Sequence, residues 1–292
     1  MRAHPTRPVI AGLLAAAACG GDPQRGVDAA PPADAAATQA VTLRFAAKVN
    51  GEALVCGHTY ANVGTPATTY TPNDLRLFVH DVALITAAGA RAAVTLAQDG
   101  RFQRGELALL DFETGGTACD MGTTATHTEI TGSVAPGSYT GVSFKLGVPE
   151  AMNHLDASTA QPPQNDTTLW WVWRSGYRYL KIDGIGGAAN PFGIHLGAIG
   201  CPGSSTTQPP SGPCAAANVA EIALTGFDAA TNLIAVDLGA VLATSNLATN
   251  TINTAPGCLS DAGDPECDAI FPRLGLAHGS TPAATQVLFG VP

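Results

Sequence analysis

The sequence predicts an all-β fold, either a β-sandwich or an open barrel, with long loops closed by disulfide bonds. Three observations support this prediction. Short segments of alternating apolar and polar residues recur along the chain, separated by turns rich in Gly, Pro, Asn and Asp. The 292 residues include 33 Gly and 21 Pro, which interrupt helices and favour turns. The sequence also lacks the alternation of strands with long helices that indicates a parallel α/β sheet.

The first forty residues are predicted to lie outside this fold. Residues 1–18 combine a short basic start with an apolar run, which is typical of an export signal. Small residues precede Cys19, as in a bacterial lipobox, so Cys19 is predicted to carry a lipid. The alternative is an ordinary signal peptide with an incidental cysteine. Residues 19–40 are rich in Ala, Pro, Gly and Asp and predict a flexible linker, which leaves residues 41–292 as the domain.

Charge and motifs exclude several functions. The formal net charge of −9 argues against nucleic acid as a partner and is compatible with cations or a basic protein. The sequence contains no Gly-x-Ser-x-Gly, His-Glu-x-x-His or phosphate-binding loop motif. We therefore expect no enzyme, although a catalytic triad dispersed along the chain stays open.

The first half of the domain predicts a series of strands. Residues 41–49 alternate in polarity, and Asn50-Gly51 is the strongest short hairpin signal before the return at residues 52–58. Residues 74–85 are apolar on both faces, which predicts a central strand. Further strands are predicted at residues 92–96, 106–112, 126–132 and 139–147.

The second half continues this pattern. A strand is predicted at residues 192–201, and residues 220–227 and 232–238 are predicted to form a hairpin. Asp237 is placed to cap a short helix. The short apolar segments 269–276 and 286–289 end the chain.

Residues 166–183 contain all three tryptophans and predict one further strand. Because successive side chains of a strand point to opposite faces, Trp171 and Trp173 are expected to share one face, with Trp170 on the other. Ser175-Gly176 is expected to bend or bulge the chain. One interpretation is aromatic packing in a core; the other is an oxidisable ring beside a metal.

Seven cysteines are present, and six remain when Cys19 is set aside for the lipid. Six cysteines in an oxidising compartment permit fifteen pairings. Local loops favour Cys201 with Cys214 and Cys258 with Cys267, and Cys56 with Cys119 follows by elimination. A metal role for the cysteines is a weaker alternative, because no Cys-x-x-Cys spacing occurs.

Four histidines are candidate metal ligands. His154 lies in a polar loop before the tryptophans, and His195 lies on a strand among glycines that permit close approach. His58 follows Cys56 by two residues, and His80 shares a strand face with apolar residues. Neutral imidazole suits copper or zinc, but each histidine taken singly is also compatible with a structural role.

The acidic loop 260–268 is a separate candidate. Its carboxylates supply oxygen ligands of the kind that bind Ca²⁺, although the spacing does not match an EF-hand. A solvated charged loop is the alternative that we favour.

An ordered set of motifs resembles the MbnP family, whose members are also called metallo-mystery-pair proteins with a four-cysteine motif. The four cysteines would correspond to Cys201, Cys214, Cys258 and Cys267. The resemblance covers nearly all of the chain after the linker. The motifs are residues 74–82, Leu110-Asp-Phe-Glu113, Leu146 to His154, Trp171-Val-Trp-Arg-Ser-Gly-Tyr177, His195 to Cys201 and Leu224-Thr-Gly-Phe-Asp228.

The resemblance implies a copper-binding protein in the periplasm or on the cell surface, attached to the outer membrane by its lipid. It implies as partner a MauG-like dihaem c-type enzyme that oxidises one tryptophan to kynurenine. Trp173 is the first candidate for that oxidation and Trp171 the second. Copper is expected on His154 and His195, then on His58 and His80. The alternatives are a structural or adhesive lipoprotein without metal, and a metal-dependent oxidase.

Overall fold

Two β-sheets and a short β-ribbon account for most of the regular structure. The computed structural model describes residues 37–119 and 122–292, and residues Ala37–Pro292 form one compact unit. The predicted export signal, the lipidated Cys19 and nearly all of the linker lie outside the described residues. Within the described residues, helices are few and short, and none has the length and apolar character needed to cross a membrane. The all-β prediction is confirmed.

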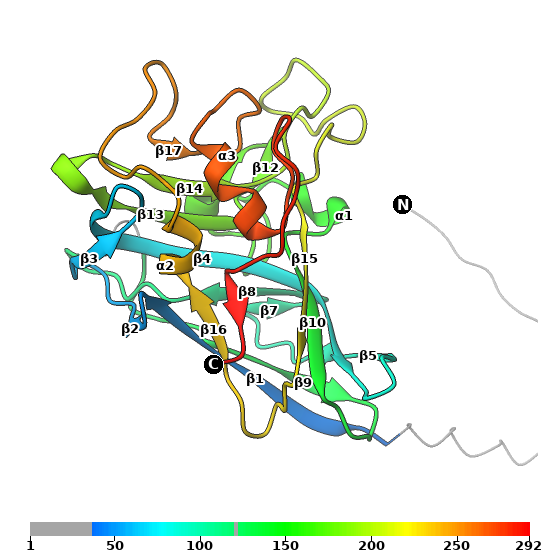
Figure 1. Cartoon of the computed structure of the whole chain (residues 1–292). Helices are drawn as coiled ribbons and strands as arrows, with labels where there is room; N and C mark the ends of the chain where they lie inside the picture. The colour runs from blue at the N-terminus through cyan, green and yellow to red at the C-terminus, as the bar shows by residue number, and fades with distance from the viewer. Residues whose placement is uncertain (1–36, 120–121) are drawn as a thin grey trace, which may run out of the picture. The chain divides into compact units, whose positions relative to one another are not determined.

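The smaller sheet has six strands in the order β18-β16-β1-β9-β6, with β2 paired to β1. Strands β16, β1, β9 and β2 are labelled in Figure 1. Strand β1 alternates as predicted and buries Val41, Leu43 and Phe45. Asn50 and Gly51 both have positive φ angles, 51° and 89°, as a tight hairpin turn requires. The strands are β1 Gln39–Val49, β2 Glu52–Ala53, β6 Thr95–Leu96, β9 Glu129–Val134, β16 Ile234–Asp237 and β18 Phe289–Gly290.

The larger sheet has ten strands and is organised around β4, Thr68–Ile85. Strand β4 is buried along most of its length and pairs with five others, which confirms the predicted central strand. The other members are β3 Tyr60–Val63, β5 Arg91–Ala93, β7 Gln103–Arg104, β8 Leu107–Asp111, β10 Gly141–Leu146, β13 Leu180–Gly186, β14 Gly193–Leu196, β15 Ala220–Thr225 and β17 Gly257–Cys258.

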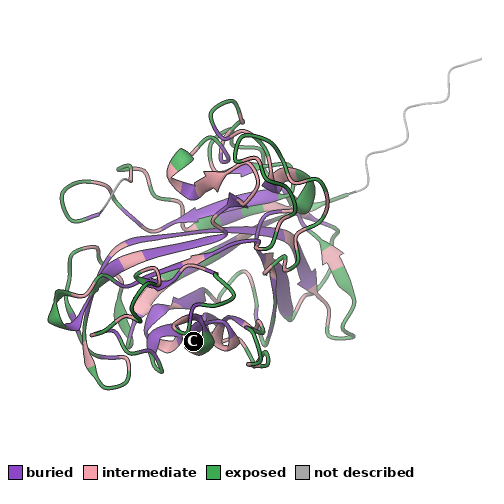
Figure 2. Ribbon diagram, turned by 90° about the horizontal axis from the view of Figure 1, so that it is seen from above, coloured by how far each residue is buried: buried purple, intermediate pink, exposed green. Residues whose placement is uncertain are grey.

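Aromatic side chains join the two sheets. Phe144 of β10 contacts Phe45 of β1 and Phe289 of β18, with ring centroids 6.0 and 5.0 Å apart. Each phenylalanine contributes about 1.5–3 kcal/mol by burial, and each pair adds about 0.5–1.5 kcal/mol. Figure 2 shows buried residues concentrated along the strands and exposed residues in the connecting loops.

All three predicted disulfides are confirmed: Cys56–Cys119, Cys201–Cys214 and Cys258–Cys267. Asp237 accepts a hydrogen bond from the Ala240 amide and caps α2, which confirms the predicted short helix. The helical segments are α1 Glu150–Asn153, η1 Thr167–Leu169, η2 Gly187–Ala189, α2 Leu238–Leu242, α3 Cys267–Ile270 and η3 Pro272–Leu274.

Three predictions about strands are wrong. Residues 92–96 are not one strand, because β5 pairs with β4 in the larger sheet and β6 pairs with β9 in the smaller one. Strands β15 and β16 do not form a hairpin, because β15 pairs with β10 in the larger sheet and β16 pairs with β1 in the smaller one. The tryptophan segment is also not one strand. It forms η1, a short ribbon of β11 (Trp170–Val172) with β12 (Gly176–Tyr177), and then β13.

The predicted common face of Trp171 and Trp173 is therefore wrong as well. Trp173 lies in the turn after β11, with its ring 6.3 Å from that of Trp170. The expected bend at Ser175-Gly176 is present. Gly176 has φ 74°, and a Cβ atom there would lie 2.4 Å from the Asn153 amide oxygen. This close packing folds the segment back on itself.

Candidate metal centre

His154 follows helix α1 and is held against the tryptophan ribbon. Its Nδ1–H donates to the Trp173 carbonyl oxygen at 2.9 Å, so Nε2 carries the ring lone pair. That Nε2 atom accepts a long hydrogen bond of 3.3 Å from Asn153, and it lies 3.7 Å from a carboxylate oxygen of Glu150. Asn153 is fully buried and accepts from the Tyr177 amide, which positions the loop that carries His154.

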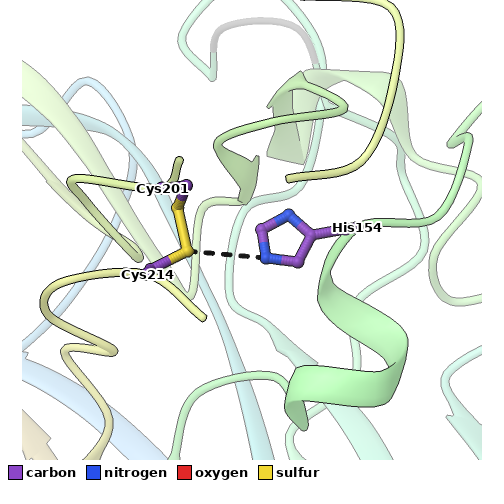
Figure 3. A group of neighbouring side chains, drawn as sticks. All are labelled: His154, Cys201 and Cys214. Atoms are coloured by element: carbon purple, nitrogen blue, oxygen red, sulfur yellow. Dashed lines mark hydrogen bonds between the residues drawn. A yellow bond between two sulfur atoms is a disulfide. The ribbon is translucent and has the colours of Figure 1, made fainter. Parts of the chain in front are cut away.

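The His154 ring points at the Cys201–Cys214 disulfide, with Nε2 3.7 Å from the Cys214 sulfur (Figure 3). The possible ligand atoms of these three residues lie within 4.8 Å of one another, which among the described residues no other trio of His, Cys, Asp and Glu side chains does. The two sulfurs are bonded to each other, however, so they are not thiolate ligands. In this state only the His154 imidazole of the trio could coordinate a metal.

His195 lies on β14 directly opposite Lys181 of β13. Its Nε2–H donates to Asp183 at 2.8 Å, which leaves the lone pair on Nδ1. Within the described residues this buried Nδ1 atom has no hydrogen-bond partner. A buried polar atom without a partner is unfavourable, and a metal ligand bond would satisfy it.

The carboxylate that orients His195 belongs to a buried charged network. Burial opposes ionisation of Asp183, but the hydrogen bond from His195 and then the charge and hydrogen bond of Lys181 hold the pKa of Asp183 below its ordinary value. Lys181 also forms an ion pair with Asp74 of the neighbouring strand β4, and Asp74 pairs in turn with Arg76 of the same strand. His195 is thus positioned by groups that are themselves fixed in the sheet.

Trp171 is the tryptophan that faces His195, with 6.5 Å between the ring centroids. The guanidinium of Arg178 lies over the same indole, 5.4 Å from its centroid. A Cβ atom at Gly197 would lie 2.3 Å from this indole, so only glycine leaves it room. Trp171 also lines an open hollow of about 610 Å³, together with Arg174, the disulfide-bonded Cys201 and Asp261.

The other two predicted ligands lie apart from these contacts. His58 is exposed, with its ring edge-on to Tyr60 and 3.8 Å from a Glu52 oxygen. His80 is buried, and its Nδ1–H donates to the Gly147 carbonyl oxygen at 3.0 Å. Burial lowers the pKa of His80.

The contacts around Trp171 include residues that the sequence reasoning missed. Asp183 orients His195, and Arg178 covers the indole. The sequence contained a signal for Asp183. It lies two residues after Lys181 in a predicted strand, so the two side chains share a face and can form an ion pair. Arg178 follows Tyr177 after the bend, where strand alternation no longer specifies which way it points.

The fold and these contacts define a class of protein: a disulfide-braced β scaffold that presents one imidazole, His195, beside the indole of Trp171 and a second, His154, against the backbone of the tryptophan ribbon. The MbnP family model matches residues 38–260, and the chain belongs to the MbnP family. The structure is similar to that of MbnP from Methylosinus trichosporium, with a TM-score of 0.75 and 28% sequence identity. The match covers 87% of this chain and 98% of that one. No curated protein matches the chain.

Proposed function

We propose that the protein is an extracytoplasmic copper-binding lipoprotein and the substrate of a MauG-like dihaem enzyme that converts one tryptophan to kynurenine. The observation that carries this proposal is the buried, unpartnered Nδ1 atom of His195 close to the indole of Trp171. Family membership supports the same conclusion, because the solved relative is itself an MbnP.

The contacts favour Trp171 as the oxidised residue, although the sequence analysis ranked Trp173 first. Trp171 lies next to the ligand candidate His195 and lines the open hollow, so the partner enzyme has access to it. Trp173 packs edge-on against Trp170, and the His154 contact is to its backbone rather than its ring. Oxidative cleavage of the C2–C3 bond of the Trp171 indole by the dihaem enzyme, with a peroxide as oxidant and C2 released as formate, would create a carbonyl and an aromatic amine on the side of His195.

The ligands that we assign are His154 and His195. Each has one ring nitrogen engaged as a donor, by Trp173 and Asp183 respectively, so the other nitrogen carries a lone pair. Neutral imidazole is a good ligand for copper, and its second nitrogen is usually fixed in this way. His58 and His80 remain ligand predictions without a comparable contact. When bound, copper would be held by these imidazoles and the modified residue, and we propose a binding role rather than catalysis.

The proposed location follows from the disulfides. Three disulfide bonds are typical of proteins that fold outside the cytoplasm. The lipid on Cys19 would then hold the domain at the membrane, through the linker of residues 19–40.

The test is co-expression with the dihaem enzyme, followed by peptide mass analysis and a copper titration against a competing chelator. The Trp171→Phe variant is expected to lose the mass gain of kynurenine and the tight copper binding, whereas Trp173→Phe retains both. His154→Ala and His195→Ala are expected to weaken copper binding without affecting the mass gain, and His58→Ala serves as the exposed control.

Two outcomes oppose the proposal. If co-expression leaves the peptide that contains residues 170–173 unchanged in mass, the partner assignment is wrong. If the protein takes up no copper in either form, the structural or adhesive alternative is correct.

A further inference from the structure

The loop closed by Cys258–Cys267 contains a carboxylate pair that none of the contacts above uses. Sequence alone favours a solvated acidic loop, but the side chains differ strongly in burial. Asp261 is exposed, and its carboxylate accepts from the Gly263 amide. Asp264 is only 2% exposed. One carboxylate of this loop has therefore been removed from water.

The buried carboxylate of Asp264 is only half satisfied. Its Oδ1 accepts from the Glu266 amide at 3.1 Å, and the Leu259 backbone amide also favours the ionised carboxylate, whereas its buried Oδ2 has no partner of good hydrogen-bond geometry in the described part of the chain. The carboxyl group of Glu266 lies within hydrogen-bonding reach of it. Two ionised carboxylates are both acceptors, so they repel each other unless a proton or a cation lies between them.

The Glu266 carboxylate is held in place from the other side. Its Oε1 accepts from the amide and the hydroxyl of Thr251, at 2.8 and 2.9 Å, and its Oε2 lies 3.4 Å from the Thr254 hydroxyl. Burial opposes ionisation of Glu266, but its hydrogen bond with Asp264, and then those from Thr251, lower its pKa. Glu266 is therefore a fixed negative charge next to a buried carboxylate.

We propose that Asp264 and Glu266 bind a hard divalent cation of the Ca²⁺ type at the base of the Cys258–Cys267 loop. The donors here are carboxylate and hydroxyl oxygens, which suit Ca²⁺, and the nearby sulfurs are closed in a disulfide. Two carboxylates neutralise a divalent charge, and water completes the oxygen coordination. The site is distinct from the histidines assigned to copper.

A shared proton is the competing way to relieve the repulsion, and pH separates the two. Burial, followed by interaction with Glu266, raises the pKa of Asp264 to about 6. The other titratable groups nearby are Asp261, Asp268 and His278, and His278 lies between the Asp268 carboxylate and the Asp261 carbonyl oxygen. Below that pKa a proton occupies the pair. Above it both carboxylates are ionised, so the affinity of the pair for a cation increases as the pH rises.

The cation would stabilise one wall of the Trp171 hollow. Leu259, Asp261 and Ala262 of the loop line that hollow. Ser260 donates to the His195 carbonyl oxygen at 2.8 Å and accepts from the Gly197 amide. Strand β17 also pairs with β14 at Cys258 and Ile194. Ordering of the loop by a cation therefore stabilises the backbone of His195.

The experiment uses the full chain with its disulfides intact, stripped of metal by a chelator. Thermal unfolding is followed at roughly pH 7.5 and pH 5, with and without Ca²⁺, and equilibrium dialysis counts the bound ion. We expect one Ca²⁺ per chain at the higher pH and a rise in Tm of about 5–10 °C at a hundredfold excess over Kd. At the lower pH the rise should be much smaller.

The Asp264→Asn variant provides the decisive comparison. An asparagine amide can donate to Glu266, so the variant is expected to fold with at least the metal-free Tm of the parent. It should nevertheless lose the response to Ca²⁺. Asp261→Asn, an exposed substitution in the same loop, should retain that response. The proposal is overturned if Ca²⁺ leaves Tm unchanged at the higher pH, or if Asp264→Asn responds like the parent. If the lower pH raises Tm but Ca²⁺ has no effect at either pH, the two carboxyl groups share a proton instead of a cation.

Discussion

Removal of the Arg76 side chain should be among the most destabilising substitutions in the larger sheet. Arg76 is 1% exposed and makes four charge-assisted hydrogen bonds. Two go to Asp74, one to Asp166 at 2.7 Å and one to Thr168 at 2.9 Å. In Arg76→Met, Asp74 stays fully buried with Lys181 as its remaining cationic partner. Loss of one partner from a buried ion pair costs about 3–5 kcal/mol, and we expect the free energy of unfolding to fall by this amount.

The assay is urea unfolding under non-reducing conditions, with Arg44→Met as the control. Arg44 pairs with Glu129 at 3.6 Å, but both side chains are about half exposed, so its loss should change the free energy of unfolding by about 0.5 kcal/mol or less. The double variant Arg76→Met/Asp74→Asn should recover about 1–3 kcal/mol relative to the sum of the single changes. If Arg76→Met costs less than about 1 kcal/mol, or if the two changes are additive, the reasoning about buried charge is refuted.

Two further predictions concern buried or partly buried carboxylates of the larger sheet. Asp183→Asn removes the charge that orients His195, so copper affinity should fall about 10–100-fold in a chelator competition; unchanged affinity would remove Asp183 from the site. The pKa of Asp111 is raised to about 7 by burial and then by Glu113. Because the folded state holds this proton more tightly than the unfolded state, stability from this group is present at low pH and is lost as the pH rises toward and past 7. Asp111→Asn should therefore raise the free energy of unfolding by about 1–3 kcal/mol near pH 8 and change it little near pH 3.5, where the unfolded carboxyl is largely protonated as well; equal effects at both would contradict the assignment.

The predictions that hold are those that depend on local signals. The two short-range disulfides follow from nearby cysteines in loops of Gly and Pro, and the Cys56–Cys119 bond follows once these are paired. Asn50-Gly51 specifies its turn because both residues adopt positive φ at low cost. The central position of β4 follows from its apolar character on both faces.

The candidate site was predicted only in part. His154 and His195 both contact the tryptophan segment, as the sequence indicated, whereas the contacts of His58 and His80 lie elsewhere. The hairpin predicted for residues 220–238 failed because its two strands find partners in different sheets. A chain segment carries no information about which distant strand lies beside it.

The sequence by itself determined the strand-rich class, the family and the disulfide pairs, because periodicity, motifs and short spacings are properties of neighbouring residues. Only the tertiary structure decided which indole lies beside His195. Gly176 packs against Asn153, which turns the chain after Val172 and sends Trp173 toward Trp170. That contact joins residues 23 positions apart, and no alternation within a single strand encodes it. The burial of Asp264 against Glu266 likewise depends on how the closed loop packs, since the sequence shows both only as acidic residues.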